Sequence, residues 1–223
     1  MAVSAVTRSN GSGKLKEIPQ DDVAEIQIDR IAAETIRVPI IGTTPLLMHR
    51  FSEKAKRMML DNMQGRKTPK DPKDPEAEYE AAFYRLGDGT PGFPVLAFKA
   101  ATVGAARFYG KSVTMTALKQ YLFFRGEPGS DGRALTRIMG EPTMREDVVR
   151  VGRGTDLRYR PQFLAWSAVL EVTFTTSVVT RDSVLSLIDA GGMGVGVGEW
   201  RPEKDGDFGT YRIDPDGNIE VVA

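Results

Sequence analysis

Aromatic and basic residues are interleaved in a glycine-rich stretch near the end of the chain. Residues 191–213 read GGMGVGVGEWRPEKDGDFGTYRI and include Trp200, Arg201 and Phe208. Aromatic rings can stack on nucleobases and guanidinium groups can bind phosphates, and single-strand binding recurrently combines the two. Glycine loses more backbone entropy on folding than other residues, so a dense run persists where a Cβ would collide with a ligand or another chain. The glycines expected to make room for a nucleic-acid backbone are Gly194, Gly196 and Gly198.

This stretch differs from the familiar phosphate loops. Those loops place their glycines between a strand and the start of a helix, whereas this stretch follows a predicted helix and precedes a predicted strand. No Gly-x-x-x-x-Gly-Lys-Ser/Thr motif occurs, and the alternating glycines lack the third glycine of a Gly-x-Gly-x-x-Gly motif. We therefore expect no nucleotide cofactor. A hairpin or surface loop without a ligand stays open as the alternative, because glycine also collects in loops.

A second segment, residues 150–163, combines arginine, glycine and tyrosine. Its sequence RVGRGTDLRYRPQF suits backbone contact together with base stacking. The alternative is a hairpin whose tyrosine belongs to the core. The residues expected to bind nucleic acid here are Arg150, Arg153, Arg158, Tyr159 and Arg160.

Basic residues also gather around the first predicted helix and the loop that follows it. Arg50, Lys54 and Arg57 are accompanied by further lysines and arginines up to Lys73, with few acids among them. Such a run could be a track for phosphates. It could equally be an ordinary solvated helix face.

His49 is the only histidine, and therefore the only candidate general base of that type. With a base to remove the proton of a 2′-hydroxyl and arginine or lysine to stabilise charge, it could support metal-independent RNA cleavage. A structural role for a lone histidine is the alternative. One histidine and no cysteine argue against a zinc site. We expect no bound metal, since Asp71, Asp74 and Glu76 are better explained as loop solvation.

Composition limits the remaining classes. The chain has 223 residues, 41% of them hydrophobic, which is enough for one sizeable core. Thirty basic and thirty acidic residues give a formal net charge of +0, so nucleic-acid binding has to depend on local patches. No long apolar run appears, and the first sixteen residues lack the apolar core of a secretory signal. We expect a soluble, cytoplasmic protein that does not contact membranes.

The elements that must position these residues follow from periodicity. Residues 1–25 are predicted to be a flexible tail, and residues 26–223 one domain with a basic loop near 65–76. Pro39 in the first strand implies an edge position or a bulge. The predicted strands are residues 35–42, 93–98, 121–124, 147–152, 168–178, 210–213 and 218–222. The predicted helices begin after Ser52, span residues 76–86 and 99–109, and run from a Thr180 cap to a stop at Gly191. This order predicts an α+β protein with a ferredoxin-like (RRM-like) βαββαβ core and insertions.

Two segments resemble a known family. The glycine-rich loop after the second core helix is similar to the signature of the RAMP superfamily, the RNA-binding subunits of CRISPR systems. The segment GFPVLAFKAATVGAARF, residues 92–108, resembles the strand-then-helix element of those proteins. The resemblance implies RNA binding, with Lys99 and Arg107 at its basic positions. Because some members cleave RNA with a histidine near the first helix, it also implies a possible role for His49. The motifs LLMH, RPQFLAW and GVGEWRPEKDGDFGTY are also similar to a set of bacteriophage early proteins.

Together these observations predict a single-stranded nucleic-acid-binding module, RNA or DNA, in which several copies align along the strand. Arginines would hold phosphates, and Trp200, Tyr159 or Phe208 would stack on bases. The first alternative is an endoribonuclease that uses His49. The second is a phage structural or host-interaction protein whose glycine loop contacts another subunit.

Overall fold

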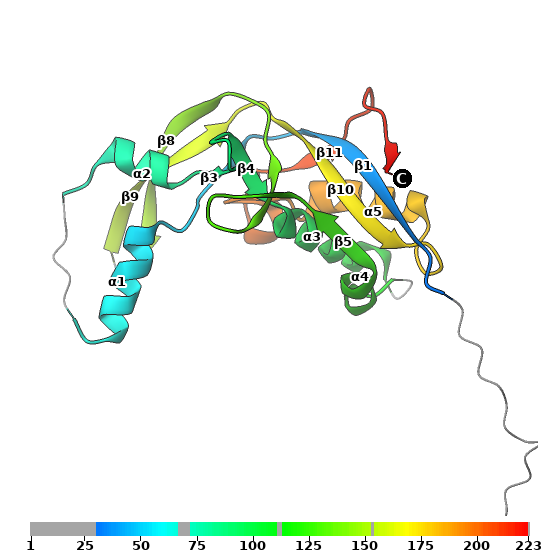
Figure 1. Cartoon of the computed structure of the whole chain (residues 1–223). Helices are drawn as coiled ribbons and strands as arrows, with labels where there is room; N and C mark the ends of the chain where they lie inside the picture. The colour runs from blue at the N-terminus through cyan, green and yellow to red at the C-terminus, as the bar shows by residue number, and fades with distance from the viewer. Residues whose placement is uncertain (1–29, 67–71, 111–112, 153, 223) are drawn as a thin grey trace, which may run out of the picture. The chain divides into compact units, whose positions relative to one another are not determined.

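An antiparallel sheet of five strands is the centre of the computed structural model (Figure 1). β1 (Ala33–Gly42) and β10 (Ser167–Thr175) lie side by side in its middle, and β5 (Leu122–Arg125) pairs with the free edge of β10. On its other edge β1 pairs with both β11 (Tyr211–Ile213) and β12 (Glu220–Val222).

The structure describes residues 30–66, 72–110, 113–152 and 154–222. The predicted tail at 1–25 and the predicted start of order near Ile26 lie outside this part. So do Arg153 and residues 67–71 of the predicted basic loop.

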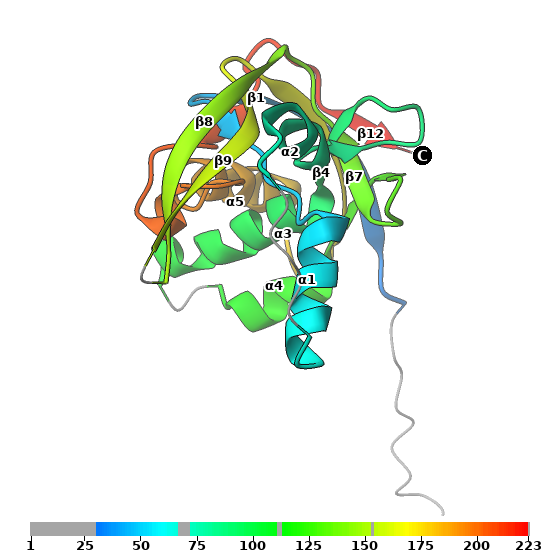
Figure 2. The ribbon, with the colours of Figure 1, turned by 90° about the vertical axis from the view of Figure 1, so that its left-hand side faces the viewer.

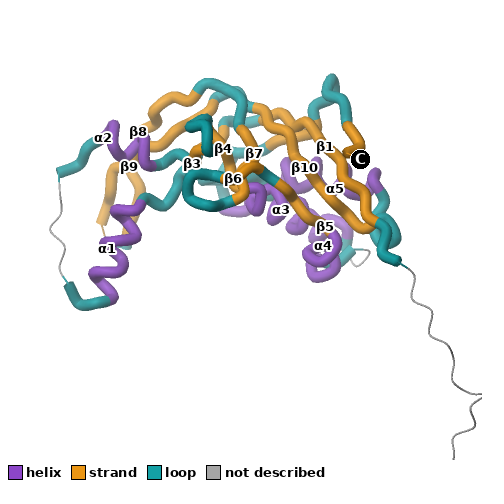
Figure 3. Tube along the Cα trace, in the orientation of Figure 1, coloured by secondary structure: helices purple, strands orange, loops and turns teal. Residues whose placement is uncertain are grey.

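One face of the sheet is apolar, as the alternation in β10 predicts. Ala168, Leu170, Val172 and Phe174 are buried on that face, and Ile36, Val38 and Ile40 of β1 are buried with them. Helices α3 (Val95–Gly104) and α5 (Arg181–Gly194) cover this side, as the tube in Figure 3 also shows. The main core therefore lies between one sheet face and two helices.

The position of Pro39 differs from the prediction. It lies in the central strand β1, opposite Val169 of β10. The other edge of β1 pairs with β12 at residues 35–37 and with β11 at residues 40–42, so Pro39 falls in the gap between these two strands. Its carbonyl accepts a bond from Asp214 N at 2.9 Å, which places its ring nitrogen on the same side, toward the gap. The prediction of an edge position or a bulge was wrong. The neighbouring strand is interrupted beside Pro39, so no backbone N–H donor is needed there.

Two helix boundaries also differ. The predicted strand at 93–98 is limited to β4 (Pro91–Pro94), and α3 begins at Val95 rather than Lys99. A short apolar run on a buried helix carries no periodicity that distinguishes it from a strand. After Gly104 the chain continues as a 3-10 helix, Ala105–Tyr109. Helix α5 starts at the predicted Thr180 cap but passes Gly191 and ends at Gly194.

The α+β class is confirmed. In chain order, the strands and the two helices on the main sheet are β1, α3, β5, β10, α5 and β11, and β12 follows them as a fifth strand beside β1. The first six elements have the order β-α-β-β-α-β. This is the order of strands and helices expected for a ferredoxin-like core. Insertions between β1 and α3 and between β5 and β10 build most of the remaining structure.

Two smaller sheets come from these insertions (Figure 2). In the first, β8 (Pro142–Val151) and β9 (Gly154–Phe163) form a long hairpin, and β2 (Leu46–Leu47) pairs with β9. The predicted strand at 147–152 is thus the second half of β8. The second sheet contains β3 (Tyr84–Arg85), β4, β7 (Ala134–Arg137) and β6 (Glu127–Pro128).

Three further helices are exposed in different degrees. α1 (Glu53–Met63) has the predicted Ser52 cap, whose hydroxyl accepts from Ala55 N, and buries none of its residues. α2 (Pro75–Ala81) is shorter than the predicted helix at 76–86, because residues 84–85 pair in β3. α4 (Met115–Tyr121) precedes β5. In the described part of the chain, no helix has both the length and the apolar character needed to cross a bilayer.

Candidate nucleic-acid interface

Trp200 is the most exposed aromatic side chain of the loop between α5 and β11. The residue is 42% exposed, and its φ of 53° lies in the left-handed region. A bulky residue rarely adopts this conformation, which costs about 1–3 kcal/mol and tends to occur at functional sites. The loop therefore holds a large ring at the surface against a conformational cost.

Phe208 and Arg145 accompany Trp200. The two ring centroids are 6.1 Å apart with planes at 34°, and the Arg145 guanidinium lies 5.0 Å from the Phe208 centroid and 5.9 Å from that of Trp200. Both distances are in the range of cation–π attraction. The sequence prediction missed Arg145, because it placed the start of β8 at residue 147. Its position opposite Arg160 depends on the register of the hairpin, which the sequence pattern does not fix.

Arg160 is buried, whereas the sequence pattern predicted an exposed residue that binds a phosphate. It is 1% exposed, and its guanidinium donates to Asp147 at 2.7 Å. Asp147 also accepts from Arg145 Nε at 2.8 Å, and Glu199 lies 3.7 Å from Arg160. Because a buried charge needs a partner, Arg160 is committed to this network and is not available to hold a phosphate.

The hairpin separates the remaining predicted residues onto two faces. Residues opposite each other in an antiparallel pair share a face, so Arg158 lies with Asp147 and Arg160, whereas Arg150 and Tyr159 lie on the other face. A hydrogen bond with Glu146, directly opposite on β8, raises the pKa of Tyr159. Of Arg150, Arg158 and Tyr159, only Arg158 therefore lies on the face of the hairpin that carries Arg145.

The predicted glycines approach this chain's own atoms. A Cβ on Gly194 would lie 2.5 Å from the Phe108 ring, and Gly196 is buried. Gly198 has a φ of 81°, and a Cβ there would lie 2.6 Å from the carbonyl oxygen of Leu47. Folding accounts for these glycines, so the prediction that they make room for a ligand is not needed to explain them.

Arg201 and Arg107 share one carboxylate. Arg201 donates to Glu203 at 2.9 Å and to the Gly198 carbonyl at 3.1 Å, and Arg107 lies 3.1 Å from Glu203. Lys99 lies on α3, before the 3-10 helix that carries Arg107, and donates to the Lys119 carbonyl. The two positions taken from the family resemblance therefore serve different parts of the molecule.

The basic residues around α1 are spread along an exposed segment. Arg50 donates through Nε to the Ala81 carbonyl at 3.2 Å, and Lys54 and Arg57 lie exposed on α1.

His49 lies half-buried between the hairpin and the glycine-rich loop. Burial lowers its pKa below the ordinary value of 6.5; Glu199 opposes this effect, and Arg158 and Arg160 reinforce it. His49 is therefore neutral at pH 7. Its Nδ1 is buried, and no hydrogen-bond partner is found for it among the described residues.

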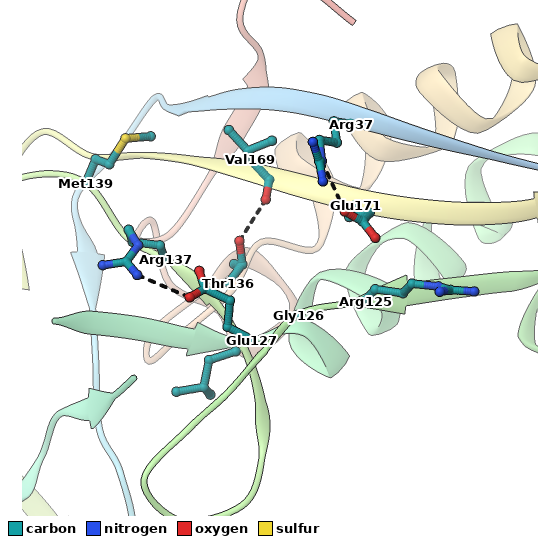
Figure 4. Close-up of a pocket in the computed structure, with 10 residues that line it drawn as sticks. Arg37, Arg125, Gly126, Glu127, Thr136, Arg137, Met139, Val169 and Glu171 are labelled. Atoms are coloured by element: carbon teal, nitrogen blue, oxygen red, sulfur yellow. Dashed lines mark hydrogen bonds and ion pairs between the residues drawn. The ribbon is translucent and has the colours of Figure 1, made fainter. Parts of the chain in front are cut away.

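The outer face of the main sheet carries a groove of about 610 Å³ (Figure 4). Arg37 pairs with Glu171 at 3.1 Å, and Arg137 pairs with Glu127 at 3.2 Å, so two of its guanidinium groups already have carboxylate partners. Arg125 is a third arginine in its lining. This groove is a competing location for an anionic ligand.

Within the described ranges, no three His, Asp or Glu side chains come close enough to hold a metal ion. Asp74 caps α2 by accepting from Ala77 N at 3.1 Å, and Glu76 lies inside that helix. Asp71 lies outside the described residues.

The sequence matches no protein-family model and no curated protein. Solved structures do match. The crystal structure of Cmr6 from Pyrococcus furiosus is 9% identical with a TM-score of 0.43, over 83% of this chain and 100% of that one. A chain in the cryo-EM structure of the Type III-B Cmr-beta bound to cognate target RNA is 11% identical with a TM-score of 0.41, over 85% and 61%. Both TM-scores are below 0.5.

Proposed function

We propose that this protein binds a single strand of nucleic acid across the Trp200 surface, which comprises Trp200, Phe208, Arg145 and Arg158. The observation that carries the proposal is the exposed Trp200 ring, held at a φ of 53° beside Phe208 and Arg145. One base stacks on this ring, which is worth about 1–3 kcal/mol for each stacked base.

The arginines supply the phosphate contacts. The Arg145 contact with Asp147 uses Nε, which leaves both terminal nitrogens of the guanidinium with donors to spare. Arg158 lies on the same face of the hairpin, 3.9 Å from Asp156, and its side chain is 35% exposed. Arg160 stays beneath them and fixes Asp147 in place.

The two tryptophans allow a direct test. Trp166 is 5% exposed and its indole N–H donates to Thr44 O, so a strand that quenches tryptophan fluorescence must reach Trp200. We expect quenching on titration with a short RNA near about 50 mM salt, where phosphate contacts are strong. RNA is the first probe because one matched structure is bound to target RNA.

Matched variants complete the test. Trp200→Ala and Trp200→Phe both keep a Cβ at the strained position, so they differ mainly in the ring. By fluorescence anisotropy with a labelled strand, we expect Trp200→Ala to bind about 5- to 150-fold more weakly and Trp200→Phe to keep most of the affinity. Equal binding by wild type and Trp200→Ala would overturn the assignment. Light scattering with and without the strand tests whether several copies align on it.

Cleavage at His49 is a second candidate function. The observation that favours it is the neutral imidazole near Arg158 and Arg160, since an unprotonated base and nearby cations are what attack by a 2′-hydroxyl requires. Incubating RNA in EDTA with wild type and His49→Ala tests it. Identical product patterns from both proteins would eliminate His49 as the base.

A further inference from the structure

A pocket of about 220 Å³ lies beneath the loop that follows α5. One wall comes from α3 and the end of β4, and the other comes from residues 195–199. Its volume is below the roughly 300–1,000 Å³ typical of sites for drug-sized ligands. It therefore suits a group the size of a single base.

Small residues of α3 create this hollow. Ala97, Ala100 and Ala101 line it, at spacings that place them on one helix face. Opposite them lie Val195 and Val197, which are 3% and 1% exposed and so are held firmly by the core. Apolar side chains from α3 and from the loop therefore line the pocket, and the ring of a base can pack against them.

The polar groups of the pocket have the properties that a nucleobase edge requires. His49 lines the pocket; because its Nδ1 is buried, Nε2 of the neutral imidazole is the nitrogen that can hydrogen-bond to a base. Burial raises the pKa of Tyr84, so its hydroxyl stays protonated. The carboxylate of Glu199 accepts hydrogen bonds.

The same groups disfavour a phosphate. Glu199 and Glu203 contribute two carboxylates to the lining. Arg201, the one arginine among the described residues that line the pocket, already pairs with Glu203. Hydrogen bonds from Arg201 and Arg107 lower the pKa of Glu203, which keeps it ionised. A phosphate would meet negative charge without an uncommitted cation, whereas an uncharged base would not.

Glu199 and Arg201 line the pocket, and Trp200 lies between them in the sequence and contacts the hairpin side chain Arg145. We propose that the pocket receives one nucleobase of the bound strand, adjacent to the base that stacks on Trp200. This inference rests on the proposed function and assigns a second base-binding subsite to the same loop.

His49 is the only histidine, so NMR spectra contain a single imidazole Hε1 signal. We expect that signal to shift when wild type is titrated with nucleoside monophosphates, and not with ribose 5-phosphate. Ala97→Leu fills the pocket and should abolish the shift. Ala77→Leu makes the same change at an exposed position of α2 outside the pocket and should leave it unchanged.

Binding of a nucleic-acid strand is the second readout. We expect Ala97→Leu to weaken binding of RNA at least about fivefold, the loss of one base contact, and to leave binding of an abasic strand unchanged. If wild type binds RNA but Ala97→Leu binds it equally, the subsite is wrong and the Trp200 surface stands. If no strand binds wild type, the proposed function fails. A His49 shift with free nucleotides alone would then mean a mononucleotide site, and its absence would overturn the pocket as well.

Discussion

Arg160 illustrates at the residue scale how burial changes what a charged side chain can do. Its guanidinium links Asp147 of β8 to Glu199 of the loop, and it lies 6.0 Å from the Trp200 ring. Removing one member of a buried ion pair costs about 3–5 kcal/mol, because the partner charge is left without compensation. Arg160 therefore acts as a positioning residue, which holds the hairpin and the loop together beneath the exposed Trp200.

Because His49 is the only histidine, a pH dependence of stability that arises from a histidine can be assigned to it. The groups that act on His49 are Glu199 from the loop and Arg158 and Arg160 from β9, and burial lowers its pKa below 6.5. Between the folded and unfolded pKa values, the unfolded chain binds more protons, so stability rises with pH in that window. The contribution of His49 is thus complete above about pH 6.5 and is lost as the pH falls below it.

We expect urea unfolding to show this effect as a difference between variants. From pH 7.5 to 5, wild type should lose more free energy of unfolding than His49→Gln, because glutamine does not titrate. Carboxylates titrate in both proteins and cancel in the comparison. Parallel losses would show that His49 is no more difficult to protonate in the folded state than in the unfolded one.

At the scale of elements, the glycines of α5 serve helix packing. Gly191 faces the backbone of Ala101 in α3, and Gly192 faces Tyr211 in β11; a Cβ would lie 2.7 Å from the Ala101 backbone and 2.2 Å from the Tyr211 carbonyl oxygen. Each distance is too short for any residue but glycine. Helix α5 can therefore lie close to both α3 and β11, and the loop that follows it begins at the edge of the main sheet.

Gly192→Ala tests this packing. A Cβ 2.2 Å from a backbone carbonyl oxygen requires a backbone shift, so we expect an overpacking cost at the upper end of the usual range of about 1–3 kcal/mol. Alanine returns about 1 kcal/mol of helix propensity. We expect a net loss that lowers Tm by about 2–4 °C for each kcal/mol. Gly87→Ala is the control, since its added Cβ would meet nothing closer than 4.0 Å. A Tm for Gly192→Ala equal to that of wild type would refute the close approach.

Patterns within single elements made much of the fold predictable. The alternation in β10, the Ser52 and Thr180 caps and the strand at β11 all appear as expected. Long-range pairing was not predictable: nothing near Pro39 reveals that its neighbouring strand is interrupted. The site shows the same limit. The spacing of Trp200 and Phe208 suggests stacking, but the partnership with Arg145 depends on hairpin register, which periodicity does not fix.

At the scale of the whole molecule, the balance of charge is the main constraint on function. The formal net charge is +0, so the protein as a whole does not attract a polyanion over long distances. The acids of the site, Asp147, Glu199 and Glu203, also offset its arginines. Affinity for a strand must then come from few phosphate contacts together with stacking, and the dependence on salt should be shallow.

This expectation can be measured as the slope of log affinity against log salt concentration. Two to four phosphate contacts to a single strand give a slope of about −1.4 to −2.8. Arg158→Gln should reduce its magnitude by about 0.7, the share of one contact. Arg125→Gln removes an exposed arginine from the outer groove of the main sheet and should leave the slope unchanged. If Arg125→Gln lowers the slope and Arg158→Gln does not, the strand lies in that groove. A slope near zero would mean that phosphates contribute nothing, and would leave the proposed strand binding without its electrostatic part.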